Sequence, residues 1–226
     1  MAKGMKEDYL SVVYDAECIP YTTYPKKLAD YLVKEYKLSE GMKMLEIGCG
    51  RGEFLNGFKQ NGLDVFGIDI SQQSKRINKN IDIDIDICNV EKEEMPHSDN
   101  TFDFVFSKSL IEHLSSPDHF LNECYRVLKP GGQILTLVPD WESNYKIYFD
   151  DYTHIRPYTI ISLRDAYKVA GFKNISVGKL RQLPLNWKYP VLNVVSFLVA
   201  PFVPIRAKNK FLRWSRELMI IGHGYK

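Results

Sequence analysis

The sequence lacks the cysteine patterns that would indicate a zinc site or a disulfide framework. Its four cysteines, Cys18, Cys49, Cys88 and Cys124, form neither a C-x-x-C pair nor zinc-finger spacing. Scattered cysteines of this kind are typical of reduced thiols in a cytoplasmic protein. We therefore expect neither disulfides nor structural zinc.

The chain also has no large excess of positive or negative charge and no long apolar run. The chain has 30 Lys and Arg against 28 Asp and Glu, and it contains no long basic run, so we expect no nucleic-acid partner. No uninterrupted apolar stretch approaches the roughly 18 residues of a membrane-spanning helix. Residues 1–9 are charged rather than apolar, so we expect no signal peptide and a cytoplasmic location.

The length of the chain favours a single domain. A chain of 226 residues, 45% of them hydrophobic, can bury a sizeable core. Within 1–226 we expect an N-terminal arm and helix over 1–41, a ligand-binding core over 42–139, and loops, an insertion and the last strands over 140–226. The tyrosine-rich residues 1–23 would either cover a ligand site or simply pack on the surface.

Apolar runs alternate with helical patterns along the chain, which predicts a parallel-rich sheet with helices on both faces. The expected strands cover 43–47, 64–69, 81–87, 102–107, 133–138, 175–177 and 218–221, and the expected helices include 53–60, 71–78, 117–127 and 162–170. Residues 129–132, Lys-Pro-Gly-Gly, are expected to form a turn. Residues 81–87 alternate Ile with Asp, which is typical of an edge strand and not of a central one. The less favoured interpretation of the three aspartates is a cation site.

The most informative segment is 43–54, which predicts a strand, a glycine-dense turn and a helix. Gly48, Gly50 and Gly52 allow backbone conformations closed to other residues and a close approach of a ligand to the main chain. Open α/β sheets hold nucleotide-like ligands at such turns. The dinucleotide pattern G-x-G-x-x-G requires glycine at position 53, which is Glu53, so a nicotinamide cofactor is disfavoured.

A carboxylate is placed to complete this site. Asp69 ends the next expected strand and follows Gly50 by 19 positions. This is about the spacing at which an acid reaches ribose hydroxyls in a βαβ unit. Asp69 could instead cap the following helix, but Ser71 competes for that position.

The motif Glu46-x-Gly-x-Gly-x-Gly52, together with Asp69, resembles the first motifs of class I S-adenosylmethionine-dependent methyltransferases of the methyltransferase-11-like kind. Segments 88–106, 109–114 and 123–132 resemble later motifs of that family, and the likeness covers about 42–139 with a looser match at 156–171. It implies a Rossmann-like, mostly parallel seven-stranded sheet with helices on both faces. It also implies S-adenosylmethionine as the cofactor and methyl transfer as the activity.

The resemblance implies roles for individual residues of the cofactor site. Gly48, Cys49 and Gly50 would pass close to the methionine part, and Glu46 would support the turn or meet the cofactor amine. Asp69 would take the ribose hydroxyls. The remaining expected contacts are Ile70 and Val90 along the adenine, Asn89 on the adenine amine in place of the family's usual acid, and the Ser107 backbone beside the amino acid moiety. Asn89 could instead be a turn residue.

The acceptor side is expected to follow the fifth strand. The segment 148–158, which contains Asp151, His154, Arg156 and Tyr158, resembles a loop of methyltransferases associated with bacterial surface polysaccharides. His154, His113 and Asp151 are the catalytic candidates, and Arg156 and Tyr158 the substrate-binding ones. Asp150 is a further candidate, and a divalent ion on Asp150, Asp151 and His154 is a disfavoured alternative, so we expect no metal.

The expected acceptor is a small or glycan-like molecule, such as a sugar hydroxyl or a phosphorylated glycan. A quinone-like or lipid-linked acceptor is the alternative, because residues 42–139 also resemble ubiquinone and menaquinone methyltransferases. A non-catalytic S-adenosylmethionine-binding module is the third interpretation. Residues 189–204 are apolar and are followed by cations up to 216, so they would form a buried insertion, a peripheral membrane or lipid contact, or a homodimer contact.

Overall fold

The computed structural model describes residues 8–12 and 20–226. Most of the arm expected over 1–23 therefore lies outside the described residues. The part that is described includes the short helix α1 (Tyr9–Val12), which lies against the glycine turn of the core.

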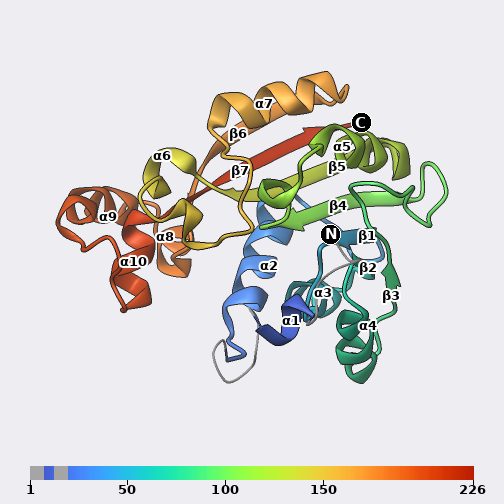
Figure 1. The fold of residues 1–226 in the computed structure, drawn as a ribbon, viewed down its shortest axis with the longest axis horizontal. Coiled ribbons are helices and arrows are strands. Elements are labelled where there is room, and N and C mark those ends of the chain that lie inside the picture. The colour runs from blue at the N-terminus through green and yellow to red at the C-terminus, as the bar shows by residue number, and fades with distance from the viewer. Residues whose placement is uncertain (1–7, 13–19) are drawn as a thin grey trace.

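A seven-stranded sheet forms the centre of the molecule (Figure 1). Its strands are β1 (Lys43–Ile47), β2 (Asp64–Asp69), β3 (Ile85–Ile87), β4 (Phe102–Lys108), β5 (Leu128–Pro139), β6 (Lys173–Arg181) and β7 (Leu218–Tyr225). Their order is β3-β2-β1-β4-β5-β7-β6, with β7 antiparallel to both neighbours and the other pairs parallel. The expected seven-stranded, mostly parallel Rossmann-like sheet is confirmed.

Helices cover both faces of this sheet (Figure 1). One face carries α2 (Tyr24–Glu35), α3 (Glu53–Lys59) and α4 (Gln72–Asn78), and the other carries α5 (Pro117–Val127) and α7 (Ile160–Val169). Each face has its own core. Leu28, Leu55 and Phe58 are buried on the first, and Phe120 and Leu163 on the second.

Two expected elements differ in detail. The alternating segment 81–87 forms a strand only over β3, because a short 3-10 helix η1 (Lys79–Ile81) and a left-handed residue, Asp82, precede it. Its predicted edge position is confirmed. The turn expected at 129–132 lies within β5, where the pairing with β4 shifts register between Phe102 and Phe104 and Gly131 adopts φ +78°.

The remaining short elements lie mainly on the acceptor side of the sheet. They are η2 (Ile111–His113), α6 (Trp141–Asn144), η3 (Tyr148–Asp150), α8 (Pro184–Lys188), α9 (Leu192–Val199), η4 (Ala200–Phe202) and α10 (Lys210–Arg216). The segment 189–204 thus forms α9 and η4, with large apolar side chains on its surface, and the interpretation of it as a buried insertion is wrong. Among residues 8–12 and 20–226, no helix is long and apolar enough to cross a membrane.

Candidate active site

The glycine turn between β1 and α3 is rigid and has an accessible backbone. Gly48, Gly50 and Gly52 all have positive φ, at +75°, +51° and +69°. A side chain at position 52 would collide with Asn78, whose Oδ1 would lie 1.6 Å from the new Cβ. The Gly50 carbonyl accepts hydrogen bonds from Asn78 and Ser74, at 3.0 and 2.6 Å. The loop is therefore fixed from behind, while a Cβ added to Gly50 would meet, among the described residues, only the side chains of Leu10 and Tyr9 within 4 Å.

Asp69 lies beside this turn at the end of β2. Its carboxylate accepts hydrogen bonds from the backbone N–H groups of Gly50 at 2.7 Å and Ser71 at 2.8 Å. The Tyr9 hydroxyl donates to the same carboxylate, at 2.9 and 3.0 Å from its two oxygens. Burial raises the pKa of Asp69, although these hydrogen bonds oppose the shift. An O–H group thus lies where the sequence places the ribose hydroxyls.

Glu46 provides a second, unsatisfied carboxylate next to the turn. The side chain is buried in β1, and its Oε2 has no hydrogen-bond partner among the described residues. Burial raises the pKa of Glu46 well above its ordinary value, and the nearby negative charge of Asp69 adds to the shift. A buried acceptor without a donor is costly, so a cationic amine at this position would stabilise it. The carboxylates of Asp69 and Glu46 therefore fit a ligand that carries both ribose hydroxyls and an amine.

The other predicted cofactor residues occupy mixed environments. Cys49 is buried, with its Sγ 3.6 Å from the Ser74 hydroxyl, and Ile70 is exposed. Asn89 makes the turn that was its alternative role, because its Oδ1 accepts the backbone N–H of Glu91 at 3.2 Å. Val90 is buried beside it. Ser107 is also buried, and its hydroxyl lies 3.2 Å from that of Thr136, so only its backbone is available to a ligand.

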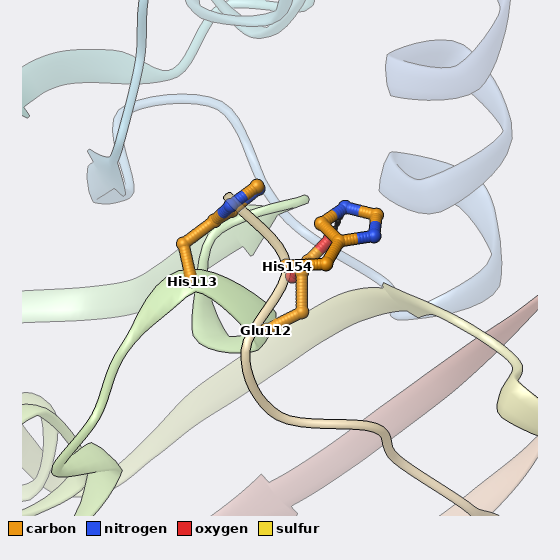
Figure 2. Close-up of side chains that lie close together, drawn as sticks. All are labelled: Glu112, His113 and His154. Atoms are coloured by element: carbon orange, nitrogen blue, oxygen red, sulfur yellow. Dashed lines mark ion pairs between the residues drawn. The ribbon is translucent and has the colours of Figure 1, made fainter. Parts of the chain in front are cut away.

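A cluster of titratable side chains follows β4. Glu112 and His113 lie in η2, and His154 lies in the loop after η3 (Figure 2). Each offers a potential ligand atom, and these atoms lie within 4.8 Å of one another. The loop is held against η2 because the backbone N–H groups of Ile155 and Arg156 both donate to the Glu112 carbonyl, at 3.0 Å. The structure thus brings together two catalytic candidates separated by 41 positions in the sequence.

Hydrogen bonds fix which nitrogen of each histidine carries the proton. His154 Nδ1 lies 2.6 Å from the Tyr148 carbonyl oxygen, which can only accept, so Nδ1 must be the donor. The Thr153 hydroxyl donates to Asp151 at 2.6 Å, which leaves its oxygen to accept from His113 Nδ1 at 2.9 Å. In the neutral rings both Nε2 atoms therefore carry lone pairs. Such nitrogens can accept a proton or bind a metal ion.

Burial sets the charge of the cluster. Glu112 is fully buried, neither of its carboxylate oxygens has a hydrogen-bond partner among the described residues, and burial raises its pKa to about 8. Burial also lowers the pKa of His113, and the neighbouring His154 adds to that effect. Asp151 lies 3.8 Å from His154 Nε2, and hydrogen bonds from Thr153 outweigh its desolvation and lower its pKa. Near neutral pH the cluster therefore combines a neutral acid at Glu112, a neutral imidazole at His113 and a carboxylate at Asp151.

These side chains line a pocket of about 260 Å³. Its wall includes Lys108, Glu112, His113, Asp151 and His154. Burial lowers the pKa of Lys108, and this lysine interacts electrostatically with both Glu112 and Glu46. Lys108 therefore links the pocket to the glycine turn, and a ligand on the turn and a second molecule in the pocket would be neighbours.

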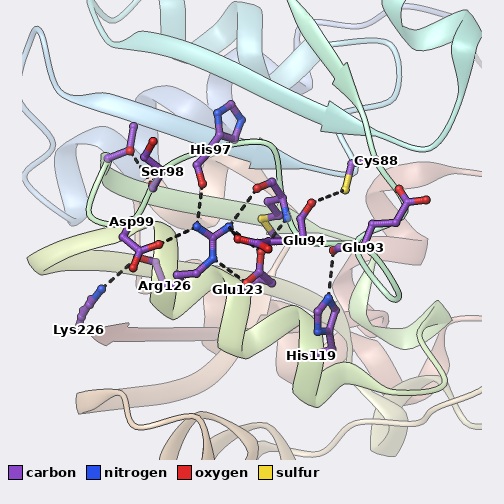
Figure 3. A network of polar contacts seen from close by, with 12 residues as sticks. Cys88, Glu93, Glu94, His97, Ser98, Asp99, His119, Glu123, Arg126 and Lys226 are labelled. Carbon is purple, nitrogen blue, oxygen red and sulfur yellow. Dashed lines mark hydrogen bonds and ion pairs between the residues drawn. The ribbon is translucent and has the colours of Figure 1, made fainter.

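A larger and shallower hollow of about 610 Å³ lies over 94–99, at the other end of β4. Arg126 lines this hollow and donates to both carboxylate oxygens of Glu123 at 2.7 Å and to Asp99 at 2.9 Å (Figure 3). It also donates to the backbone carbonyl of His97. These bonds fasten the loop to α5, and parallel sheets place their ligands at the opposite, carboxyl ends of the strands. We interpret this hollow as structural.

The structure does not bring the two substrate-binding candidates into the pocket wall. Arg156 is exposed and donates to the Ser115 carbonyl at 2.8 Å. Tyr158 is 3% exposed and packs in the core beside α7, so its hydroxyl cannot reach the pocket without a rearrangement. Asp150 also lies outside the cluster, because it pairs with Arg206 at the surface. Asp150, Asp151 and His154 therefore do not converge on one point that could hold a metal ion.

Sequence reasoning missed Glu112, Lys108 and Tyr9 as members of the site. Glu112 directly precedes His113 within the segment 109–114, so the sequence marks its position. Nothing in the sequence indicates that its carboxyl group is buried without a hydrogen-bond partner among the described residues. Lys108 ends β4, next to Ser107, and reads as an ordinary strand-terminal lysine. The Tyr9 contact with Asp69 has no sequence signal beyond the tyrosine content of the arm.

Comparison with known proteins defines the class. The chain aligns over 95% of its length with a S-adenosylmethionine-dependent methyltransferase from Archaeoglobus fulgidus, covering 99% of that chain with a TM-score of 0.67 and 19% identity. The fold is therefore that of class I methyltransferases. Residues 45–136 match a family model described as a methyltransferase domain. Residues 45–136 are thus similar to a methyltransferase domain and lie on a class I methyltransferase fold, and the expected cofactor, S-adenosylmethionine, is confirmed.

Two curated relatives illustrate the range of sequence similarity. A phosphoethanolamine N-methyltransferase from Plasmodium falciparum is 26% identical over 211 residues, which cover 83% of this chain and 76% of the relative. A ubiquinone biosynthesis O-methyltransferase from Alkalilimnicola ehrlichii is 28% identical over 124 residues, covering 53% of this chain. The chain spans only half the length of that second relative. The two relatives differ in acceptor, so the comparisons do not identify the acceptor of this chain.

Proposed function

We propose that this protein transfers a methyl group from S-adenosylmethionine to an oxygen of a small, glycan-like acceptor, either a sugar hydroxyl or a phosphorylated glycan. The observation that carries the proposal is the pocket that His113 and His154 line, next to the glycine turn, with each Nδ1 hydrogen-bonded and each Nε2 left to accept. An alcohol acceptor must lose a proton as it is methylated, and a histidine nitrogen with a lone pair is suited to take it.

The cofactor would be held by the residues around the turn. Gly48, Cys49 and Gly50 offer backbone to its methionine part, Asp69 would bind the ribose hydroxyls, and the unsatisfied Glu46 would pair with its amine. Ile70, Asn89, Val90 and the Ser107 backbone complete the proposed contacts along the adenine and the amino acid moiety. When bound, the cofactor supplies an electrophilic methyl group on a sulfonium, so the protein mainly has to align the acceptor.

The acceptor's proton would pass to His154 Nε2. The Tyr148 carbonyl holds His154 in the required tautomer, because it accepts the Nδ1 proton at 2.6 Å. Asp151, 3.8 Å from Nε2, would stabilise the imidazolium that forms. His113, anchored through Thr153, would orient the same hydroxyl. Arg156 remains a candidate for acceptor contact, because it is exposed and could meet a phosphate group. Tyr158 would contact the acceptor only after a rearrangement of the core.

A quinone-like or lipid-linked acceptor is the second candidate. It is favoured by the exposed apolar side chains of α9 and α10, which lie on the acceptor side of the fold. The similarity to a ubiquinone biosynthesis O-methyltransferase points in the same direction. The loop around His154 favours the glycan-like acceptor.

The test is formation of S-adenosylhomocysteine in the presence of candidate acceptors. A phosphorylated sugar, a nucleotide sugar and a hydroxyquinone analogue would each be incubated with the protein and S-adenosylmethionine. We expect turnover with a sugar acceptor and a loss of at least about 100-fold in kcat for His154→Ala, which removes the general base. His119→Ala is the matched control, because that histidine lies outside the pocket and its Nε2 bonds the Glu93 carbonyl oxygen at 3.0 Å.

The outcomes separate the candidates. Turnover only with the quinone analogue would favour the second acceptor class. Tight binding of S-adenosylhomocysteine without turnover on any acceptor would favour a non-catalytic binding module. Equal kcat for wild type and His154→Ala would contradict the assigned proton acceptor while leaving the methyltransferase assignment intact.

A further inference from the structure

The segment 184–216, here called the α8–α10 surface, exposes an unusual amount of apolar area. It protrudes from one end of the sheet, next to α6 (Figure 1). The large side chains on it include Val191, Phe197, Phe202 and Phe211, which are 72%, 69%, 87% and 66% exposed. Val194, Val195, Leu198 and Leu212 are exposed as well. Contiguous apolar patches of this kind usually mark an interaction site.

Helix α9 buries a polar residue and exposes apolar ones, which is the opposite of a helix that packs on a protein core. The residue it buries is Ser196, whose hydroxyl accepts from the Asn186 amide at 2.9 Å. Asn186 also donates to Asn193 Oδ1 at 3.0 Å. A surface helix normally turns its apolar stripe inward and its polar residues to water. Here hydrogen bonds hold α9 to α8, and the exposed apolar residues of the helix are Val194, Val195, Phe197, Leu198 and Val199.

All the charged residues of the α8–α10 surface are positive. Residues 184–216 contain six cations, Lys188, Arg206, Lys208, Lys210, Arg213 and Arg216, and no Asp or Glu, although the whole chain has a net charge of only +2. Arg206 and Arg213 pair with Asp150 and Glu217, both outside the segment. Lys188, Lys208 and Lys210 are exposed and form no ion pair among the described residues. Their charges are therefore available to an anionic partner.

We propose that the α8–α10 surface docks this protein onto an anionic lipid bilayer. Exposed aromatic and aliphatic side chains flanked by lysine and arginine are the combination that binds the interface of a membrane with negative headgroups. Helix α9 has 8 residues, so it would lie in the interface and not cross it. The inference is independent of the proposed acceptor.

A second copy of the chain is a poorer occupant of this surface. A symmetric dimer buries the same patch on both subunits, so it would bring together two sets of the exposed cations Lys188, Lys208 and Lys210. The segment supplies no acidic residue to neutralise them, and like charges across an interface are costly. An anionic bilayer, in contrast, complements both the charge and the apolar side chains.

Docking would bring the pocket close to the membrane surface. Gln182 and Glu217 lie within two residues of the segment in the sequence, and both line the pocket that contains His154. A bilayer against α9 and α10 would therefore lie beside the pocket wall. An acceptor attached to a lipid could then reach the pocket without leaving the membrane.

Vesicle sedimentation with the full chain tests the proposal. The protein would be mixed with vesicles of phosphatidylcholine alone or of phosphatidylcholine with phosphatidylglycerol. We expect binding to the anionic vesicles that weakens as salt is raised, with little binding to the neutral ones. Phe197→Asp combined with Phe202→Asp should lower the partition coefficient at least about tenfold, because two exposed phenylalanines no longer insert. Lys208→Glu with Lys210→Glu should have a similar effect.

The matched control is Ile161→Asp with Val169→Asp, which changes two exposed apolar residues on α7, away from the surface. It should leave vesicle binding unchanged, and circular dichroism and S-adenosylhomocysteine binding would verify that every variant is folded. The proposal is overturned if the wild type does not bind anionic vesicles or if the α7 variant loses binding equally. A concentration-dependent dimer that Phe197→Asp abolishes, without vesicle binding, would assign the surface to a second copy instead.

Discussion

Asp69 is the residue on which cofactor affinity should depend most directly. Replacing it with alanine removes the acceptor for the ribose hydroxyls and leaves the Gly50 and Ser71 N–H groups without this partner. We expect Asp69→Ala to weaken S-adenosylhomocysteine binding by about 1–3 kcal/mol, as measured by isothermal titration calorimetry. Asp64→Ala, at the exposed start of the same strand, is the control and should bind like wild type. Unchanged affinity in Asp69→Ala would argue against the proposed ribose contact.

Glu112 should make the stability of the protein depend on pH. Burial raises the pKa of this carboxyl from 4.5 to about 8, so between these values the folded state binds a proton that the unfolded state has released. The contribution is fully present below about pH 4.5 and is lost as pH rises towards 8. We therefore expect Glu112→Gln to gain stability relative to wild type as pH increases, by up to about 1.4 kcal/mol per pH unit.

Urea unfolding of wild type and Glu112→Gln at several pH values between 5 and 8 measures this difference. The control is Glu40→Gln, an exposed glutamate at which the same comparison should give a difference independent of pH. A constant difference between wild type and Glu112→Gln would show that the carboxyl is ionised in the folded protein throughout this range.

For single residues, the sequence predicted where a residue lies relative to the strands better than it predicted whether its side chain is buried and what it contacts. The turn at 48–52 and Asp69 were placed by spacing, because a βαβ unit fixes where one strand ends relative to the next. The burial of Glu112 depends on Tyr148 and on the loop that folds over η2, and neither has a local pattern. For the same reason Tyr158, which belongs to a loop motif, was expected at a substrate and packs in the core.

At the scale of elements, α1 covers the cofactor site. The Tyr9 hydroxyl occupies the acceptor oxygens of Asp69, and Leu10 lies 3.7 Å from where a Cβ on Gly50 would be. A ribose bound to Asp69 as proposed would have to displace this hydroxyl. We expect Tyr9→Phe to bind S-adenosylhomocysteine about threefold to tenfold more tightly, which corresponds to one hydrogen bond of net worth near 1 kcal/mol. Titration calorimetry on both proteins measures the change.

Tyr24→Phe is the control for this substitution, because the Tyr24 hydroxyl bonds Gln182 at 3.3 Å and makes no contact with Asp69. Its affinity for S-adenosylhomocysteine should equal that of wild type. Weaker binding in Tyr9→Phe would show that the hydroxyl stays in the site and contributes to holding the cofactor, which would reverse the interpretation of α1 as a competitor.

Element boundaries departed from prediction where tertiary contacts decide them. Alternation predicted a strand over the whole of 81–87, yet Lys59 donates to the carbonyls of Ile81 and Asp82 and holds them in a turn. The isoleucines nevertheless face the core as the alternation predicts, because Ile83 and Ile85 are both buried. At 129–132, proline and glycine signalled a turn, but the backbone continues as strand because Gly131 donates to the carbonyl of Lys226 at the end of β7. Such contacts are invisible to a local pattern.

For the whole molecule, the alternation of strands and helices was enough to predict the sheet and both helical layers. The early strands are buried and apolar, so each was recognisable by itself. The acceptor side was harder to predict, since residues 140–226 insert helices α8 to α10 between β6 and β7 and turn their apolar side chains outward. A rule that assigns apolar residues to the core fails for these helices, because their large apolar side chains lie on the surface.

Cofactor binding should stabilise the entire fold, because the glycine turn, α1 and α4 all contact Asp69 or Gly50. A ligand at about 100 times its Kd adds about 2.7 kcal/mol of stability, which in a chain of this size raises Tm by about 5–11 °C. We expect this shift with S-adenosylhomocysteine and none with NAD, because Glu53 stands where the dinucleotide pattern needs glycine. Differential scanning fluorimetry measures both. Asp69→Ala at the same ligand concentration should show a smaller shift, and an equal shift with NAD would contradict the assigned cofactor.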